Sequence, residues 1–163
     1  MAFEIRDATP DDARAIRRIA RASWHAAYDD ILGEEAVDSV VDDWYGVEGL
    51  RESISRDDAR FLVADADAPV GFAQAVRDDD GPAWFPRIYV HPGRWGERIG
   101  SEMLAEIESW LRGGDQERLR LAVIADNEVG NAFYEKRGYE VVSETDEELF
   151  GVEFEEYVRE KEL

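Results

Sequence analysis

The sequence predicts an α+β or mixed α/β fold, with helices on the faces of one sheet. Several short segments alternate apolar and polar residues as strands do. Amphipathic stretches with helical spacing separate these segments, and turn-forming residues stand between the two kinds. A chain of 163 residues is long enough for a sizeable core, and no low-complexity linker interrupts it. We therefore expect residues 1–163 to form a single domain.

The first half of the chain opens with a strand and a long helix. Residues 3–6 alternate apolar and polar residues, Thr9 is a suitable N-cap, and Pro10 suits the first helical position. Apolar residues then recur at helical spacing, so we expect this helix to run to about Tyr28 and to be broken near Gly33. The same patterns predict two shorter helices at 34–44 and 47–56 and two strands at 61–64 and 70–76.

The second half alternates strands with helices. Residues 84–90 predict a strand, and Pro86 within it indicates an edge or a bulge. A helix from about Ile99 to Leu111 should end at Gly113 and Gly114. The remaining elements that we expect are a strand at 119–123, a short helix at 128–136 closed by Gly138, and strands at 139–143 and 152–158.

The composition excludes several kinds of function. The chain contains no cysteine, so disulfides, thiolate metal sites and cysteine nucleophiles are ruled out. His25 and His91 are the only histidines, and we therefore expect no metal site. No apolar run approaches the roughly 18 residues of a membrane span, and the N-terminus lacks the order of a signal peptide. We expect a cytoplasmic protein with no membrane partner.

The net charge of −20 is the most unusual bulk property. Nucleic-acid binding is disfavoured, because neutralising phosphates requires clustered lysine and arginine. Two explanations remain open: a surface adapted to very high salt, where repulsion between carboxylates is screened, or a field that attracts a cationic substrate. The acidic pairs are dispersed along the chain rather than clustered, which favours the salt-adapted surface.

A turn that contains glycine and arginine, His91–Arg98, leads into the helix expected from Ile99. The first N–H groups of a helix have no internal partner and carry a partial positive charge. Gly96 and Gly100 would let a pyrophosphate approach the backbone closely. The turn is neither a Walker loop nor a Gly-x-Gly-x-x-Gly dinucleotide motif. From this turn alone, a helix start that binds nothing remains an alternative.

A second segment, Asp126–Tyr139, predicts a short helix with Asn127 at its start and Tyr134 in its middle. A phosphate-binding turn followed by a phenol indicates a phosphate-bearing cofactor and an acid that protonates its leaving group. The alternative is that Tyr134 is a half-buried aromatic residue on an amphipathic helix.

The two segments together resemble two motifs of the GCN5-related N-acetyltransferases, the GNAT family. The last glycine of the family's acetyl-CoA signature, Gln/Arg-x-x-Gly-x-Gly/Ala, aligns with Gly100. Trp95 and Arg98 depart from the signature, Arg98 at the usual inner glycine. The residues that fit are Gly96, Ile99, Gly100 and Leu104 in the first motif and Asn127, Ala132, Phe133, Tyr134, Glu135, Lys136 and Gly138 in the second, in which Tyr139 replaces the usual Phe.

This resemblance implies a central, mostly antiparallel twisted sheet of about six to seven strands flanked by about four helices. It implies acetyl-CoA as cosubstrate, and acetyl transfer to a primary amine by direct attack in a ternary complex. Tyr134 would be the general acid, Asn127 would contact the CoA arm, and the amide near Val90 would polarise the thioester carbonyl. The other cofactor-binding residues it implies are Ile88, Tyr89, Gly96, Glu97, Arg98, Ile99, Gly100, Ser101 and Asn131.

The general base and the acceptor are less well defined. Trp84 and Ala122 stand where many family members have a glutamate, so we name no general base. Trp24 and Tyr28 share one helical face and are candidates for an acceptor wall, with core packing as the alternative for Trp24. The acceptor is either a small-molecule amine or a peptide amine at an N-terminus or a lysine. A non-catalytic CoA-binding sensor or interaction module, and a homodimer, also stay open.

Overall fold

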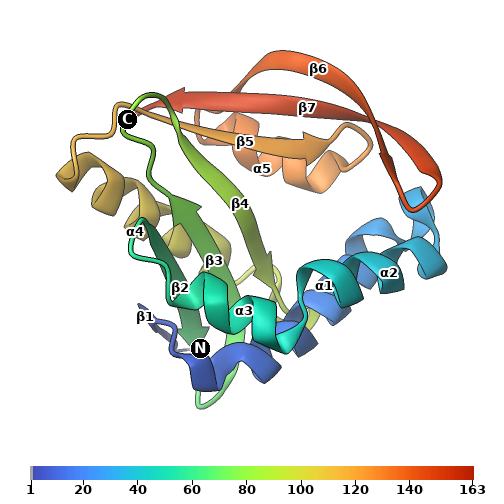
Figure 1. Cartoon of the computed structure of the whole chain (residues 1–163), viewed down its shortest axis with the longest axis horizontal. Coiled ribbons are helices and arrows are strands. Elements are labelled where there is room, and N and C mark those ends of the chain that lie inside the picture. The colour runs from blue at the N-terminus through green and yellow to red at the C-terminus, as the bar shows by residue number, and fades with distance from the viewer. Residues whose placement is uncertain (1) are drawn as a thin grey trace.

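A computed structural model describes residues 2–163 as a seven-stranded sheet with helices on both faces (Figure 1). The strand order is β1-β2-β3-β4-β5-β7-β6, and every neighbouring pair is antiparallel except β4–β5. The elements in chain order are β1 (Glu4–Asp7), η1 (Pro10–Asp12), α1 (Ala13–Leu32), α2 (Glu34–Trp44), α3 (Val47–Ile54), β2 (Ala59–Asp65), β3 (Pro69–Val76), β4 (Ala83–Val90), η2 (Pro92–Arg94), α4 (Ile99–Gly113), β5 (Arg118–Ile124), α5 (Glu128–Lys136), β6 (Glu140–Leu149) and β7 (Val152–Glu162). The predicted fold class is confirmed.

The predicted elements are all present, although some of them are longer than expected. The described residues form five α-helices, which are the five that the residue patterns predict, whereas the family resemblance implies about four. Helix α1 continues to Leu32 and ends at Gly33, whose φ of +88° is accessible mainly to glycine. Strand β6 extends to Leu149 because it pairs with β7 along its length, although its outer half is almost entirely acidic or polar. The sequence of this half of β6 therefore lacks the alternation of apolar and polar residues that predicts a strand.

The core lies in two layers, one on each face of the sheet. Helices α1, α2 and α3 cover one face with a cluster that includes Ile16, Tyr45 and Phe72. Helices α4 and α5 cover the other face, where Met103, Ile107 and other apolar residues pack against β2 to β5 (Figure 1). Within residues 2–163, no helix has the length and apolar character needed to cross a membrane.

Strands β4 and β5 part soon after they begin. Their parallel pairing covers only Ala83 with Leu119 and Trp84 with Arg120. Beyond that point a register shift between β3 and β4 lies opposite Phe85 and Pro86, which confirms the bulge predicted at the proline. The diverging strands open a gap in the middle of the sheet.

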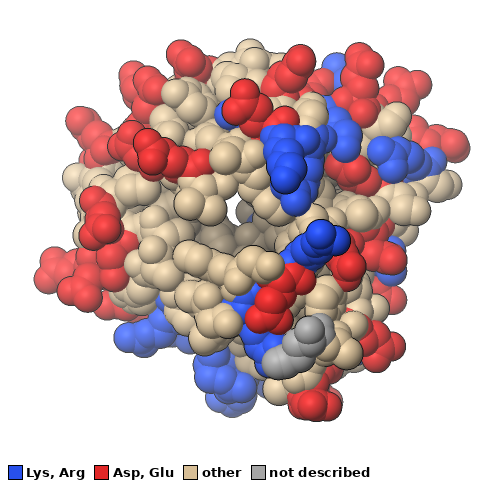
Figure 2. Space-filling view, turned by 180° about the vertical axis from the view of Figure 1, so that it is seen from behind, with Lys and Arg blue, Asp and Glu red and all other residues tan. Residues whose placement is uncertain are grey.

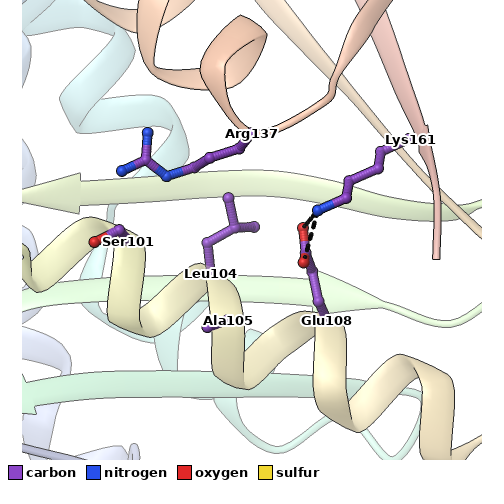
Figure 3. Close-up of a pocket in the computed structure, with 6 residues that line it drawn as sticks. All are labelled: Ser101, Leu104, Ala105, Glu108, Arg137 and Lys161. Atoms are coloured by element: carbon purple, nitrogen blue, oxygen red, sulfur yellow. Dashed lines mark hydrogen bonds and ion pairs between the residues drawn. The ribbon is translucent and has the colours of Figure 1, made fainter.

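A buried polar network ties α4 to the end of α5 and to β7. Glu108 of α4 is 7% exposed, and its carboxylate accepts a hydrogen bond of 2.6 Å from the hydroxyl of Tyr139. Lys161 of β7 donates to both oxygens of the same carboxylate at 3.0 Å, beside a pocket of about 170 Å³ (Figure 3). The tyrosine that replaces the family's usual phenylalanine therefore has a partner that a phenylalanine would lack.

Candidate active site

A cleft of about 690 Å³ occupies the gap between the diverging strands. Its walls come from α1, β4, the loop that follows β4, the start of α4, the end of β5 and α5. Figure 2 shows a hollow on the back of the molecule with basic side chains beside it, while many acidic side chains lie around the periphery of this face. The arginines that line the cleft after β4 are Arg94, Arg98 and Arg137.

The loop between β4 and α4 has two residues with left-handed backbone conformations. Gly96 has a φ of +86° and Arg98 a φ of +66°. The family's inner glycine is thus replaced by arginine, while the conformation that favours glycine is kept. The loop is held by His91, whose Nδ1 accepts from the amide of Gly93 at 3.0 Å, and by Trp95, whose Nε1 donates to the carbonyl of Val90 at 2.8 Å.

The start of α4 fits a pyrophosphate. The first helical backbone hydrogen bond runs from the amide of Glu102 to the carbonyl of Arg98, so the amides before it are available to a ligand. A methyl group built on Gly100 would lie 3.6 Å from the ring of Phe133, so packing alone does not require a glycine there. Because Gly100 has no side chain, its backbone is open toward the cleft, which Arg98 and Ser101 also line.

The end of β4 has N–H groups that point into the cleft. The amide of His91 donates to the carbonyl of Val70 at 2.8 Å, on the β3 side of the strand. Because successive amides of a strand point in opposite directions, the N–H groups of Val90 and Ile88 point toward the parted β5. The N–H of Val90 is therefore not used by β3, which is compatible with the donor role that the sequence resemblance implies for it.

Tyr134 lies on the cleft wall next to Tyr28 and Tyr89. Among residues 2–163 its hydroxyl has no hydrogen-bond partner, so it is available to a ligand. Burial, and to a smaller extent the neighbouring Tyr28, raises the pKa of Tyr134. The phenol is therefore protonated at neutral pH and can donate a proton.

Asn127, which the sequence predicts at the start of α5, makes one contact within that helix and one contact with α1. Its Oδ1 accepts from the amide of Gly130 at 2.9 Å and so caps α5, while its Nδ2 donates to the hydroxyl of Tyr28 at 3.1 Å. The Tyr28 hydroxyl also lies 3.3 Å from that of Tyr89. Asn127 lines the cleft, but within the described residues both ends of its amide are already used. Asn131 donates to the carbonyls of Ile124, Ala125 and Asn127 and is absent from the cleft lining.

The two residues expected at the acceptor wall have different surroundings. Tyr28 lines the cleft, whereas Trp24 is 4% exposed and packs in the core with its ring 4.4 Å from that of Tyr28. Three acids, Asp30, Asp126 and Glu128, also line the cleft and can attract an ammonium group. Ala122 lines it as well and, as the sequence indicated, provides no base.

The comparisons with known proteins agree with this geometry. The model of the acetyltransferase (GNAT) family matches residues 14–139, which is most of the chain. This chain belongs to the GNAT family. As a family member it is an acetyl-CoA-dependent N-acetyltransferase.

Three GNAT relatives are similar over most or all of the chain. A spermidine N(1)-acetyltransferase from Thermoplasma acidophilum is 32% identical over 146 residues, covering 86% of this chain and 90% of the relative. The crystal structure of PaiA N-acetyltransferase from the same organism, in complex with coenzyme A, has a TM-score of 0.87 and 31% identity over 100% of both chains. A GCN5-related N-acetyltransferase from Rhodopseudomonas palustris shares the fold with a TM-score of 0.84 and 22% identity, over 100% of this chain and 97% of that one.

The sequence reasoning on this GNAT member missed several cleft residues. Arg87, Phe133 and Arg137 line the cleft, and the indole of Trp95 closes the loop onto β4. Arg87 had one visible signal, since it is the only charged residue in the strand predicted at 84–90. The role of Trp95 as a hydrogen-bond donor has no such signal.

Proposed function

We propose that this protein transfers the acetyl group of acetyl-CoA to a primary amine by direct attack in a ternary complex. The observation that carries the proposal is that three kinds of donor line one cleft: the first amides of α4, the outward amide of Val90 and the free hydroxyl of Tyr134. The complete absence of cysteine from the chain excludes an acetyl-cysteine intermediate.

The start of α4 would hold the pyrophosphate, with Gly96, Gly100 and Ser101 supplying backbone and hydroxyl groups and Arg98 a charge. Acetyl-CoA supplies a thioester whose carbonyl carbon the amine attacks. The N–H of Val90 would donate to the carbonyl oxygen as negative charge develops on it. Ile88 and Tyr89 extend the edge along which the CoA arm would lie.

Tyr134 would protonate the departing thiolate. A phenol kept protonated by burial suits this role, because its proton is transferred to a sulfur that becomes basic only during the reaction. The cap that Asn127 provides fixes the first turn of α5 and thereby the position of Tyr134 within it. We therefore assign Asn127 a positioning role in addition to the expected contact with the CoA arm.

The acceptor would enter on the side of the cleft where Tyr28 and the acids lie. Asp30, Asp126 and Glu128 favour a positively charged amine there. Spermidine is one acceptor to test, because a relative 32% identical to this chain is named for it. Peptide amines belong in the same panel, since the cleft is open to solvent at its mouth.

The experiment is amine-dependent release of the free CoA thiol from acetyl-CoA. The panel contains polyamines, amino acids, aminoglycosides and short peptides, and the protein contributes no thiol of its own. Release with any amine class supports the proposal. Acetyl-CoA binding without turnover of any amine, in both low and molar KCl, would overturn it in favour of a non-catalytic CoA binder.

A further inference from the structure

Arg87 lies in the middle of β4 and lines the cleft. Its guanidinium carbon is 5.1 Å from the ring centroid of Tyr45 and 5.8 Å from that of Phe61. Both rings belong to the core under α1, α2 and α3, so Arg87 points to that face of the sheet. The loop proposed to hold the pyrophosphate follows the C-terminal end of β4 and leads into α4. Arg87 is therefore separate from the arginines beside that loop.

The guanidinium of Arg87 has no polar partner. Across residues 2–163 it forms no ion pair and donates no hydrogen bond, and its Nη1 is fully buried. Tyr45 also has Trp24 beside it, whose ring lies 6.5 Å away and whose indole interacts with the tyrosine hydroxyl. Arg87 is therefore the group near Tyr45 that lacks a polar partner among the described residues.

Arg87 is partly buried, and a partly buried charge without a partner is destabilised relative to one that an anion pairs with. The chain has 39 acidic residues, yet none of those described lies within ion-pair distance of Arg87. Tyr45 does not neutralise it, because burial raises the pKa of that phenol to about 12, against the smaller effect of Arg87. The two aromatic rings stabilise the cation only in part.

We infer that Arg87 binds a carboxylate carried by the acceptor amine, so that the acceptor is an amino carboxylate rather than a polyamine. This inference rests on the proposed function, since it concerns the acceptor of that reaction. A planar guanidinium matches the two oxygens of a carboxylate, and a site built for an anion disfavours a second ammonium group.

The strand sets the spacing between amine and carboxylate. Arg87 stands three residues before Val90, which corresponds to roughly 10 Å along an extended strand. An acceptor whose amine attacks beside Val90 and whose carboxylate reaches Arg87 must therefore be longer than a single α-amino acid. The structure favours an acceptor in which a chain of several atoms joins amine and carboxylate, such as an ω-amino acid or a dipeptide.

The test compares matched pairs of amines with and without a carboxylate. The probes are ω-amino acids of increasing length, each paired with the alkylamine of equal length, together with Gly-Gly and spermidine. We expect the best amino carboxylate to exceed its alkylamine in kcat/KM by about 10- to 100-fold. In Arg87→Met, which keeps an apolar stem, this ratio should fall to nearly one while the alkylamine rates change little.

The matched control is Arg77→Met. Arg77 also covers an aromatic ring, that of Trp110 at 5.2 Å, but it does not line the cleft. Its removal should leave the carboxylate preference unchanged. Thermal melting provides a readout independent of turnover: removing an unpaired charge should leave the stability of Arg87→Met equal to or above that of the parent, whereas a merely structural Arg87 would lower it.

The outcomes separate the two proposals. No turnover of any amine contradicts the proposed function itself. Turnover of amines without a carboxylate preference, or with a preference that Arg87→Met leaves intact, overturns the inference and leaves the function standing. Spermidine as the best acceptor, with unchanged or higher rates in Arg87→Met, also overturns it.

Discussion

Tyr134 combines a partly buried ring with a hydroxyl that no described side chain or carbonyl uses. Its ring meets those of Phe133 at 5.3 Å and Tyr139 at 5.8 Å, both edge-on. These contacts fix the direction of the ring, so the hydroxyl position is set by packing rather than by a hydrogen bond. A residue of this kind can lose its hydroxyl without a loss of packing.

Tyr134→Phe should lower kcat about 10- to 100-fold, because the thiolate then leaves without a proton donor. The affinity for acetyl-CoA should change little. Steady-state kinetics with the best amine of the panel and calorimetric binding of acetyl-CoA measure the two quantities. Unchanged turnover would remove Tyr134 from the mechanism, and a loss of binding alone would make it a cofactor contact.

Arg98 has a backbone conformation that usually favours glycine. Its φ of +66° is unfavourable for any residue with a Cβ, yet Arg98 adopts it at the entrance to α4. The arginine supplies a charge where a glycine would supply only a conformation.

Arg98→Gly should be more stable than Arg98→Ala by about 1 kcal/mol, since only alanine retains the left-handed strain. Both variants lack the guanidinium, so the comparison isolates the backbone. Urea denaturation gives the two free energies of unfolding. Acetyl-CoA affinity should fall in both variants by a similar factor. A fall in Arg98→Ala alone would show that the conformation of the loop, and not the charge, determines binding.

At the scale of elements, the long helix α1 is joined to α2 by a cluster of one histidine and two aspartates. His25 of α1 lies 2.6 Å from the carboxylate of Asp29 and 2.9 Å from that of Asp38 on α2. Burial acts to lower the pKa of His25, but the hydrogen bonds that its ring donates to the carboxylates of Asp29 and Asp38 outweigh it, and the pKa is raised above its ordinary value. The histidine is thus a pH-dependent link between the two helices.

This link predicts how stability depends on pH. Because the folded-state pKa of His25 exceeds the unfolded value of about 6.5, its contribution is complete below that value and disappears as the pH rises through the folded pKa. Relative to His25→Gln, the parent should be more stable by about 0.5–1 kcal/mol near pH 5.5 and should lose this advantage as the pH rises through the folded-state pKa.

Urea denaturation of both proteins across this range measures the effect, and an NMR titration of the His25 ring gives its pKa directly. Asp38→Asn serves as the control, because removing one acceptor should reduce the pH dependence. An advantage that grows toward high pH would contradict the assigned link.

At the scale of the molecule, arginines lie at the cleft although the chain as a whole is strongly acidic. The net charge is −20, yet Arg94, Arg98 and Arg137 line the cleft, and Figure 2 shows basic groups beside the hollow. Many of the exposed residues in strands β6 and β7 are acidic. Repulsion among these carboxylates opposes the compact state, and salt weakens it.

The melting temperature should therefore rise with KCl into the molar range, where the Debye length falls to about 3 Å. We expect an increase of about 5–10 °C, equivalent to a few kcal/mol for a domain of this size. Calorimetry in a KCl series measures it, with an uncharged osmolyte at equal osmolality as the control. A melting temperature that stays flat or falls would count against a salt-adapted surface.

The sequence by itself determined the order of the elements, the bulge at Pro86, the family and the two segments that meet at the cleft. These features follow from local spacing: the alternation of strands, the periodicity of helices, and glycines and prolines whose backbone demands are local. Gly33 at the end of α1 and Asn127 at the start of α5 are of this kind, because a terminus or a cap involves only neighbouring residues.

Only the tertiary structure decided which side chains face the cleft and which are buried. Trp24 and Tyr28 occupy one helical face and look alike in the sequence, but only Tyr28 reaches the cleft. Tyr28 of α1 is joined to Tyr89 of β4 and to Asn127 at the start of α5, which lie far from it in the chain. The lack of a polar partner for Arg87 likewise depends on which distant residues pack around it. Contacts of this range depend on the packing of the whole sheet, which no local pattern in the sequence specifies.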